Sequence, residues 1–231
     1  MKPGVYTLFY LIGTILLLSS CTPKEHKTTE GAKEGPKPMA PVQEEVRKRI
    51  QQVEKSDFEG NLEKYGLLEE TGNYEGRYTK LRADGSLIEE AYYNDGAIDG
   101  LRILYYPTQD TQIVETHVNG LFHGPYRSYY KGNRVKLSGE YNENQMQGIW
   151  YKYYETGEIM EEVTFVDNLE NGPFTEYHLN GQISVQGTYL DGDNEDGELK
   201  FFTEEGVHYK TMNCNKGMCR TTWRLENETT E

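Results

Sequence analysis

Basic residues are scarce in this 231-residue chain, which has 24 Lys and Arg against 38 Asp and Glu and a net charge of −14. Proteins that bind nucleic acid or anionic headgroups use Lys and Arg to neutralise phosphates. The charge balance therefore predicts that nucleic acid is not a partner. Two explanations of the acidity remain open: it keeps an exposed sheet soluble, or it steers basic partners toward the protein.

Long apolar runs are absent except at the N-terminus, where residues 5–18 are apolar and follow Lys2. This run is too short to span a membrane comfortably and has the form of a signal peptide. The sequence Leu18-Ser-Ser-Cys21 resembles the lipobox of bacterial lipoproteins, in which cleavage precedes a cysteine that then receives acyl chains. The resemblance implies a lipoprotein signal peptide over 1–20 and membrane attachment through lipidated Cys21, since several acyl chains hold firmly. The alternative is an ordinary secreted signal with an incidental cysteine.

Cysteine is nearly absent from the rest of the chain, with Cys214 and Cys219 only. An even pair in an exported protein favours a disulfide. The two residues bracket Asn-Lys-Gly-Met, so a turn there places them opposite each other across a hairpin. Zinc is disfavoured, because a C-x₄-C pair lacks further Cys or a nearby His cluster.

Signatures of catalysis and metal binding are also missing. No serine stands in a Gly-x-Ser-x-Gly turn, and carboxylates such as Glu89, Glu161 and Glu162 read as solvated positions spread along the chain. The acidic stretch 191–198 hints at calcium but departs from the EF-hand pattern, and the pair His117 and His123 suggests no third ligand. We therefore expect no metal, no cofactor and no enzymatic activity.

Helical periodicity is absent after residue 56. Before it, residues 21–40 are rich in Pro, Gly, Lys and Glu, which predicts a disordered tether. Apolar residues then fall on one helical stripe from Val42 to Val53, with Pro41 placed to start a helix. We expect an amphipathic helix over 41–56 that shields a sheet edge, and a disordered tail over 226–231.

A glycine recurs every 24 residues through the middle of the chain, and this period predicts an array of identical supersecondary units. The glycines are Gly76, Gly100, Gly124, Gly148 and Gly172, with Gly197 after one inserted residue. Counted from this glycine as position zero, positions two and five are mostly aromatic, and Gly or Asn at positions nine and 20 predict tight turns. The alternating Tyr and β-branched residues between them are typical of strands. The prediction is an all-β fold over 57–225: an elongated antiparallel β-meander with one hairpin per repeat.

The segment Gly148-Ile-Trp-Tyr-Lys-Tyr-Tyr-Glu-Thr-Gly157 resembles the MORN-repeat variant common in bacterial proteins. Residues 124–130 and 172–177 look like further copies, and six concordant copies cover about residues 65–225. The resemblance implies elongated antiparallel sheets of hairpins and a binding or scaffolding role without catalytic residues. Many bacterial members of this family carry the label of antitoxin.

Together these features predict a non-enzymatic lipoprotein of the bacterial cell envelope that binds an unknown protein or an envelope polymer through its sheet. Thr22 does not resemble the aspartate that retains lipoproteins at the inner membrane, which favours the outer membrane. The alternative is an antitoxin or immunity-type lipoprotein that neutralises a basic toxin. An aromatic row is the candidate binding surface if it faces solvent, and a packing ladder otherwise. Its residues are Tyr105, Tyr129, Trp150, Tyr153 and Tyr177.

Overall fold

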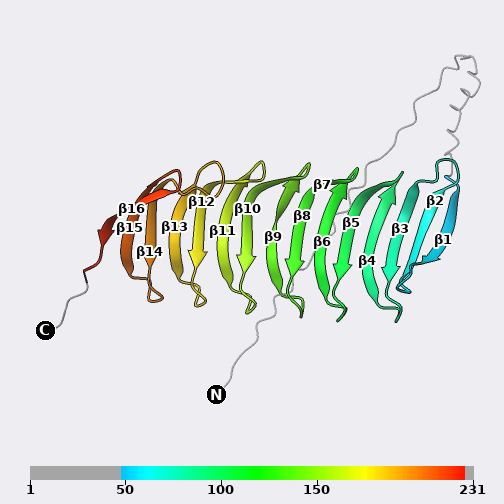
Figure 1. Ribbon diagram of the computed structural model, residues 1–231, viewed down its shortest axis with the longest axis horizontal. Helices are drawn as coiled ribbons and strands as arrows, with labels where there is room; N and C mark the ends of the chain where they lie inside the picture. Colours follow the sequence, from blue (N-terminus) through cyan, green and yellow to red (C-terminus); the bar gives the residue numbers. More distant parts are fainter. Residues whose placement is uncertain (1–47, 227–231) are drawn as a thin grey trace, which may run out of the picture. The chain divides into compact units, whose positions relative to one another are not determined.

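Figure 1 shows the computed structural model of the chain, which describes residues 48–226. All of these residues belong to one compact unit. The predicted signal peptide, Cys21, the tether, residues 41–47 of the predicted helix and residues 227–231 of the predicted tail lie outside the described residues.

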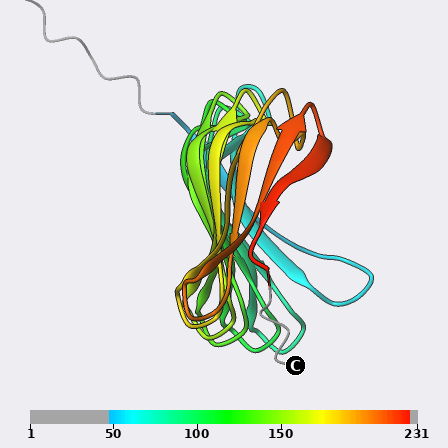
Figure 2. The ribbon, with the colours of Figure 1, turned by 90° about the vertical axis from the view of Figure 1, so that its left-hand side faces the viewer.

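The described part of the chain is a single antiparallel sheet of sixteen strands with no helix. Neighbours in the sheet are neighbours in the sequence throughout, and the two-residue β7 pairs with β6 beside this path. The strands form one curved layer (Figure 2), which confirms the predicted antiparallel meander of hairpins. Their bounds are β1 Ile50–Ser56, β2 Leu62–Leu68, β3 Tyr74–Leu81, β4 Leu87–Asn94, β5 Ala97–Tyr105, β6 Thr111–Val118, β7 Leu121–Phe122, β8 Gly124–Tyr129, β9 Val135–Asn142, β10 Gln145–Tyr153, β11 Ile159–Val166, β12 Leu169–Tyr177, β13 Ile183–Tyr189, β14 Gly197–Phe202, β15 His208–Asn215 and β16 Met218–Arg224.

The prediction of a helix over 41–56 is wrong for its second half. Residues Ile50–Ser56 form β1, which pairs with β2 along its whole length from Ile50↔Leu68 to Ser56↔Leu62. A helix of so few residues has little stability of its own, whereas a strand here satisfies the backbone N–H and C=O groups of β2. The segment therefore extends the sheet and does not cover its edge.

The turns predicted at positions nine and 20 are confirmed, and those at position 20 also connect successive repeats. Each contains two residues with left-handed backbone, such as Asp95 (φ 48°) and Gly96 (φ 88°), a geometry that suits tight hairpins. The second residue of each turn donates its N–H to a carbonyl in the preceding hairpin, as from Gly96 to Tyr74 (2.8 Å) and from Gly217 to Glu195 (2.9 Å). A regular series of backbone hydrogen bonds thus connects successive hairpins along one rim of the sheet.

The glycines at position zero lie within or at the start of strands and form bulges. Between the pairs Ala91↔Arg102 and Tyr93↔Ile98, β5 advances by four residues while β4 advances by two. Gly100, at the centre of this irregularity, has φ 116°. Only glycine adopts left-handed backbone at a bulge without a large energetic cost. The glycine that recurs every 24 residues therefore marks a bulge in each repeat and not a turn.

Most buried side chains lie on one side of the sheet, at positions two, 15 and 17 of the repeats. We call this side the aromatic face, after rings such as Trp150 and Tyr141, whose centroids are 5.1 Å apart. Glycine is required beneath the largest ring, because a Cβ on Gly139 would lie 2.1 Å from the Trp150 indole. The residues at these positions are Tyr78, Ala91, Tyr93, Arg102, Glu115, His117, Tyr126, Gly139, Tyr141, Trp150, Val163, Phe165, Phe174, Gly187, Tyr189, Leu199, Met212 and Cys214.

Candidate binding surface

The five residues predicted as one binding surface are divided between the two faces of the sheet. Trp150 belongs to the aromatic face and is only 2% exposed. The four tyrosines at position five lie on the opposite face: the Tyr105 hydroxyl donates to Glu90 (2.7 Å), which neighbours buried Ala91 in β4 and so points the other way. The prediction of a common surface is therefore wrong for Trp150, which offers almost no area to a partner.

The tyrosines at position five are half-buried, and some of their hydroxyls are engaged within the sheet. Burial, followed by the hydrogen bond to Glu90, raises the pKa of Tyr105 to about 12. The Tyr153 hydroxyl lies 3.4 Å from Ser138 Oγ. Burial and the neighbouring Glu162 raise the pKa of Tyr177. These contacts are those of the packing ladder that was the alternative interpretation of this row.

The residues at position six form a ladder along the second rim. The hydroxyl of each tyrosine donates to the backbone carbonyl at position five of the next repeat: Tyr106 to Tyr129 (2.8 Å), Tyr130 to Tyr153 (2.9 Å) and Tyr154 to Tyr177 (2.7 Å). In the next repeat, His178 Nε2 lies 2.9 Å from the Phe202 carbonyl. The sequence signal for this ladder is the repeated Tyr-Tyr pair, whose second member is not among the residues predicted as a binding surface.

Acidic side chains on the N-terminal part of the aromatic face are paired with basic ones. Arg102 joins Glu89 (2.7 Å) and Glu115 (3.1 Å), and His117 Nε2 lies 3.2 Å from the same Glu115 carboxylate. Glu115 and His117 are each 5% exposed. The expectation that Glu89 is solvated is therefore wrong, since its side chain is 15% exposed and bound to a guanidinium.

Four carboxylates on the C-terminal part of the same face have no such partners. Glu161 and Glu176 are directly opposite each other on β11 and β12, while Glu170 faces Phe165 and Glu195 faces Tyr189. All four are half-buried, and none of them forms a salt bridge within residues 48–226.

The electrostatics of this group follow from partial burial and mutual repulsion. Burial is the main cause that raises the pKa of Glu170, with further contributions from Glu161 and Asp193. Burial likewise raises the pKa of Glu176, and Glu161 adds to it while Lys152 opposes it. Ionisation of Glu170 and Glu176 is thus less favourable here than in water.

Two adjoining hollows lie beside three of these carboxylates, Glu161, Glu170 and Glu176, and we call them together the acidic trough. One has a volume of about 210 Å³ and the other of about 280 Å³, and both are lined by Lys152 and Glu161. Trp150, Val163 and Phe165 line the first, which gives the trough an apolar floor beside its acidic residues. The complete lining is Leu137, Met146, Trp150, Lys152, Met160, Glu161, Val163, Phe165, Glu170 and Glu176, together with Tyr177 of the opposite face, which contributes to the second hollow.

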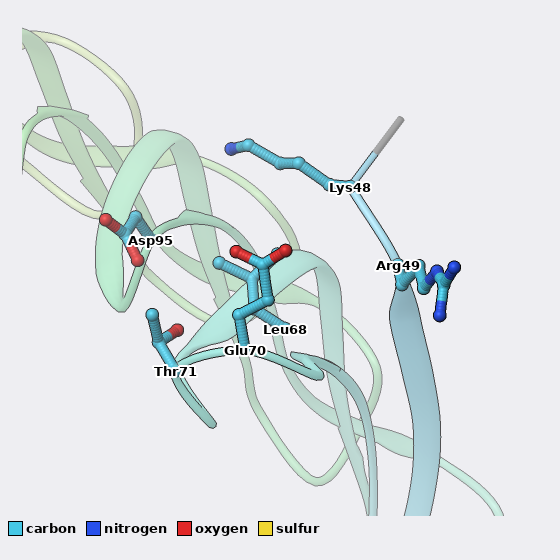
Figure 3. Close-up of a pocket in the computed structure, with 6 residues that line it drawn as sticks. All are labelled: Lys48, Arg49, Leu68, Glu70, Thr71 and Asp95. Carbon is cyan, nitrogen blue, oxygen red and sulfur yellow. The ribbon is translucent and has the colours of Figure 1, made fainter. Parts of the chain in front are cut away.

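A further hollow of about 220 Å³ lies beside the first strand (Figure 3). Lys48, at its rim, donates to Glu75 (2.8 Å) and to Asn94 (3.1 Å). The Arg49 side chain points away from Thr71 and Asp95 in Figure 3. Because this hollow brings opposite charges together, it is a weaker candidate for a charged ligand than the acidic trough.

Two residues of the histidine pair and the acidic stretch, His117 and Asp196, contact other residues of the sheet. Over residues 48–226, no group of three or more His, Cys, Asp or Glu side chains is arranged to hold a metal ion. His117 is buried against Glu115, whereas His123 is exposed. In the acidic stretch, Asp196 Oδ1 accepts a hydrogen bond from the backbone of Lys216 (3.2 Å).

The last hairpin is closed by a disulfide. Cys214 on β15 and Cys219 on β16 are direct cross-strand partners, with an S–S distance of 2.00 Å and a Cα–Cα distance of 4.0 Å. Cys214 is also buried against the aromatic face. Within the described range of the chain, no helix has the length and apolarity needed to cross a membrane.

Comparison with known families identifies the repeat. The model of the MORN repeat variant family matches residues 146–167 and 170–191, which include most of the β10–β11 and β12–β13 hairpins. This part of the chain is therefore similar to MORN repeats of the variant type, and the same hairpin geometry continues on both sides of it. No curated protein matches the chain.

Proposed function

We propose that the protein is a non-enzymatic, membrane-anchored repeat lipoprotein whose sheet is a protein-binding or scaffold surface in the bacterial cell envelope. The observation that carries the proposal is the single layer: over residues 48–226 no second layer covers either face. Charged and aromatic side chains consequently lie in rows along the sheet. A row of this kind suits contact with an extended partner surface, whereas acid–base catalysis needs groups that converge in a cleft.

The MORN-type repeats support the binding role, because such repeats generally serve as binding modules. The lipobox-like sequence before Cys21 supports the anchor, and Thr22 supports the outer membrane as its location. Binding and anchoring are separable, so each has its own test.

Metabolic labelling with a palmitate analogue tests the anchor. We expect the wild-type chain to carry the label and to fractionate with membranes, and Cys21→Ser to lose both properties. Thr22→Ser is the matched control and should retain them. An equally labelled Cys21→Ser variant would contradict the anchor.

Photo-crosslinking in intact cells tests the binding surface. A photoreactive residue at Lys152, on the aromatic face, should capture a discrete partner, whereas the same residue at Asn180, on a turn of the rim, should not. Identical adduct patterns at the two positions would contradict binding through the sheet face.

An immunity-type role, in which the protein neutralises a basic toxin at the membrane, is the second candidate. The unpaired carboxylates and the net charge of −14 favour it. Co-expression with a toxin encoded beside this protein should then restore growth, and continued growth arrest would count against this role.

A further inference from the structure

The acidic trough occupies places that other repeats give to apolar side chains. Two residues before each repeat glycine, the side chain contributes to the aromatic face, as Phe122 does by packing on Tyr141 at 5.0 Å. In the first four repeats this position is apolar or aromatic: Tyr74, Ile98, Phe122 and Met146. In the last two it is Glu170 and Glu195. The change is confined to the C-terminal part of the face.

These carboxylates make the free protein less stable. A partly buried charge loses hydration, and like charges directly opposite each other on neighbouring strands are destabilising. Glu161 and Glu176 are such a pair, and Glu170 stands opposite the ring of Phe165. On the N-terminal part of the face the same cost is offset by Arg102 and Lys80, but no corresponding salt bridge forms here within the described chain. The trough holds one lysine, Lys152 on β10, which lies opposite Glu161 without forming a salt bridge to it, so the carboxylates outnumber the cations.

The floor of the trough holds an unsatisfied donor as well. Trp150 lines the trough and is 2% exposed, and its Nε1–H has no hydrogen-bond partner among residues 48–226. A buried donor without a partner is costly. This nitrogen has almost no accessible surface, so the carboxylates around the trough define the occupant: it carries cationic groups, which a polypeptide can present in a row.

We propose that the acidic trough binds a lysine- or arginine-rich segment of a partner protein. The cationic groups pair with Glu161, Glu170 and Glu176, and the methylene stems of the basic side chains lie along the half-buried Phe165, as long basic side chains do on apolar surface. This inference rests on the proposed binding function and names the chemistry of the partner. A bare metal ion fits less well, since the described carboxylates form no metal-binding group.

Fluorescence anisotropy with a defined peptide tests the inference. The probe is a fluorescein-labelled octapeptide of alternating lysine and alanine, titrated with the full-length protein in uncharged detergent at low salt. The same peptide with glutamate in place of lysine is the charge control. We expect saturable binding of the lysine peptide, weakened by added salt, and no binding of the glutamate peptide.

Matched variants locate the site. Glu170→Gln with Glu176→Gln should raise the dissociation constant at least tenfold. Glu140→Gln with Glu155→Gln removes the same charge from exposed positions outside the trough and should change the constant less than twofold. Melting temperatures establish that all proteins are folded.

Two results would overturn the inference: no binding of the lysine peptide by the wild type, or equal weakening in both double variants, which indicates diffuse acidity only. The crosslinking experiment has an independent readout. A discrete adduct without peptide binding supports the proposed function and contradicts only the inference that the partner segment is basic. Peptide binding without an adduct supports the trough and counts against the proposed function.

Discussion

The two ends of the aromatic face share one backbone geometry, but the carboxylates at the N-terminal end form salt bridges and those at the C-terminal end do not within the described chain. In β4–β6, Glu89 and Glu115 are held by Arg102. In β11–β12, Glu161 and Glu176 face each other with no cation bridging them. Since both regions belong to one continuous sheet, the difference lies in the side chains. A carboxylate on this face is a structural element where it has a local partner, and it is available for binding where it has none.

Removal of the central cation should give the largest effect. Arg102→Met leaves Glu115, which is almost fully buried, without a counter-charge, and we expect the free energy of unfolding to fall by about 3 kcal/mol. Urea denaturation followed by tryptophan fluorescence measures it. Lys152→Met on the C-terminal part is the control, with an expected change below about 0.5 kcal/mol. Equal losses would abolish the contrast between the two ends.

Loss of one hydrogen bond from the tyrosine ladder on the second rim should lower the free energy of unfolding equally at both ends of the sheet. This equality separates backbone geometry from charge pairing. Tyr106→Phe and Tyr154→Phe each remove one hydroxyl-to-carbonyl hydrogen bond, of 2.8 Å and 2.7 Å. Each variant should lose about 1 kcal/mol in unfolding free energy. Tyr151→Phe is the matched control, because the Tyr151 hydroxyl makes no such bond in the described chain. Unequal losses would show that the ends differ in more than their charge pairing.

Neutralisation of one carboxylate should have opposite signs at the two ends. Glu176→Gln relieves repulsion with Glu161 and should raise the unfolding free energy by about 0.5 kcal/mol. Glu89→Gln weakens the ion pair with Arg102 and should lower it. Thermal melts of the two variants under identical conditions provide the measurement. Destabilisation by Glu176→Gln would show that this carboxylate has a local partner after all.

Acidification should change the stability of the two ends in opposite directions. A carboxyl group with a raised pKa binds its proton more tightly in the folded state, so the region around Glu170 and Glu176 should gain stability as the pH falls from neutral toward the ordinary value of 4.5. The hydrogen bond from Tyr105, and then Arg77, lowers the pKa of Glu90, so β4 and β5 should lose stability as the pH falls below 4.5.

Hydrogen exchange resolved by segment, corrected for the intrinsic pH dependence of exchange, measures both changes. Protection of β11–β13 should increase over the first interval, and protection of β4–β5 should decrease over the second. The variant Glu170→Gln with Glu176→Gln should lose the first effect and keep the second. Parallel behaviour of the two regions would contradict their different electrostatics.

Most of the fold follows from the sequence because the repeat reports the same information several times. The Gly and Asn residues near positions nine and 20 accept left-handed backbone, and they mark the turns. The conformation of the position-zero glycines is not obvious from sequence, because a bulge and a turn both favour glycine. The helix predicted over Ile50–Ser56 is wrong for another reason. A short apolar stripe is compatible with a helix, but pairing with the edge of β2 makes this segment a strand.

The site was less predictable, because burial and facing depend on the register of neighbouring strands. Trp150 and Tyr153 are three residues apart, so alternation along β10 by itself places them on opposite faces. Which of the two faces is buried depends on the packing of neighbouring strands. The pairing of Glu89 with Arg102 also required the register. The replacement of Met146 by Glu170 at the same repeat position was visible in the sequence, and it was the one available signal of the trough.

Each hairpin of the array meets only its neighbours, because the strands follow the order of the chain. The protein can therefore work as a molecular ruler. One unit contributes two strands, or about 9.6 Å across the sheet, and a small fixed rotation from the sheet twist. Duplication or loss of a whole unit would move everything beyond it by that increment while the contacts inside every other hairpin persist. The spacing between two features on such a molecule can evolve in steps, independently of the features themselves.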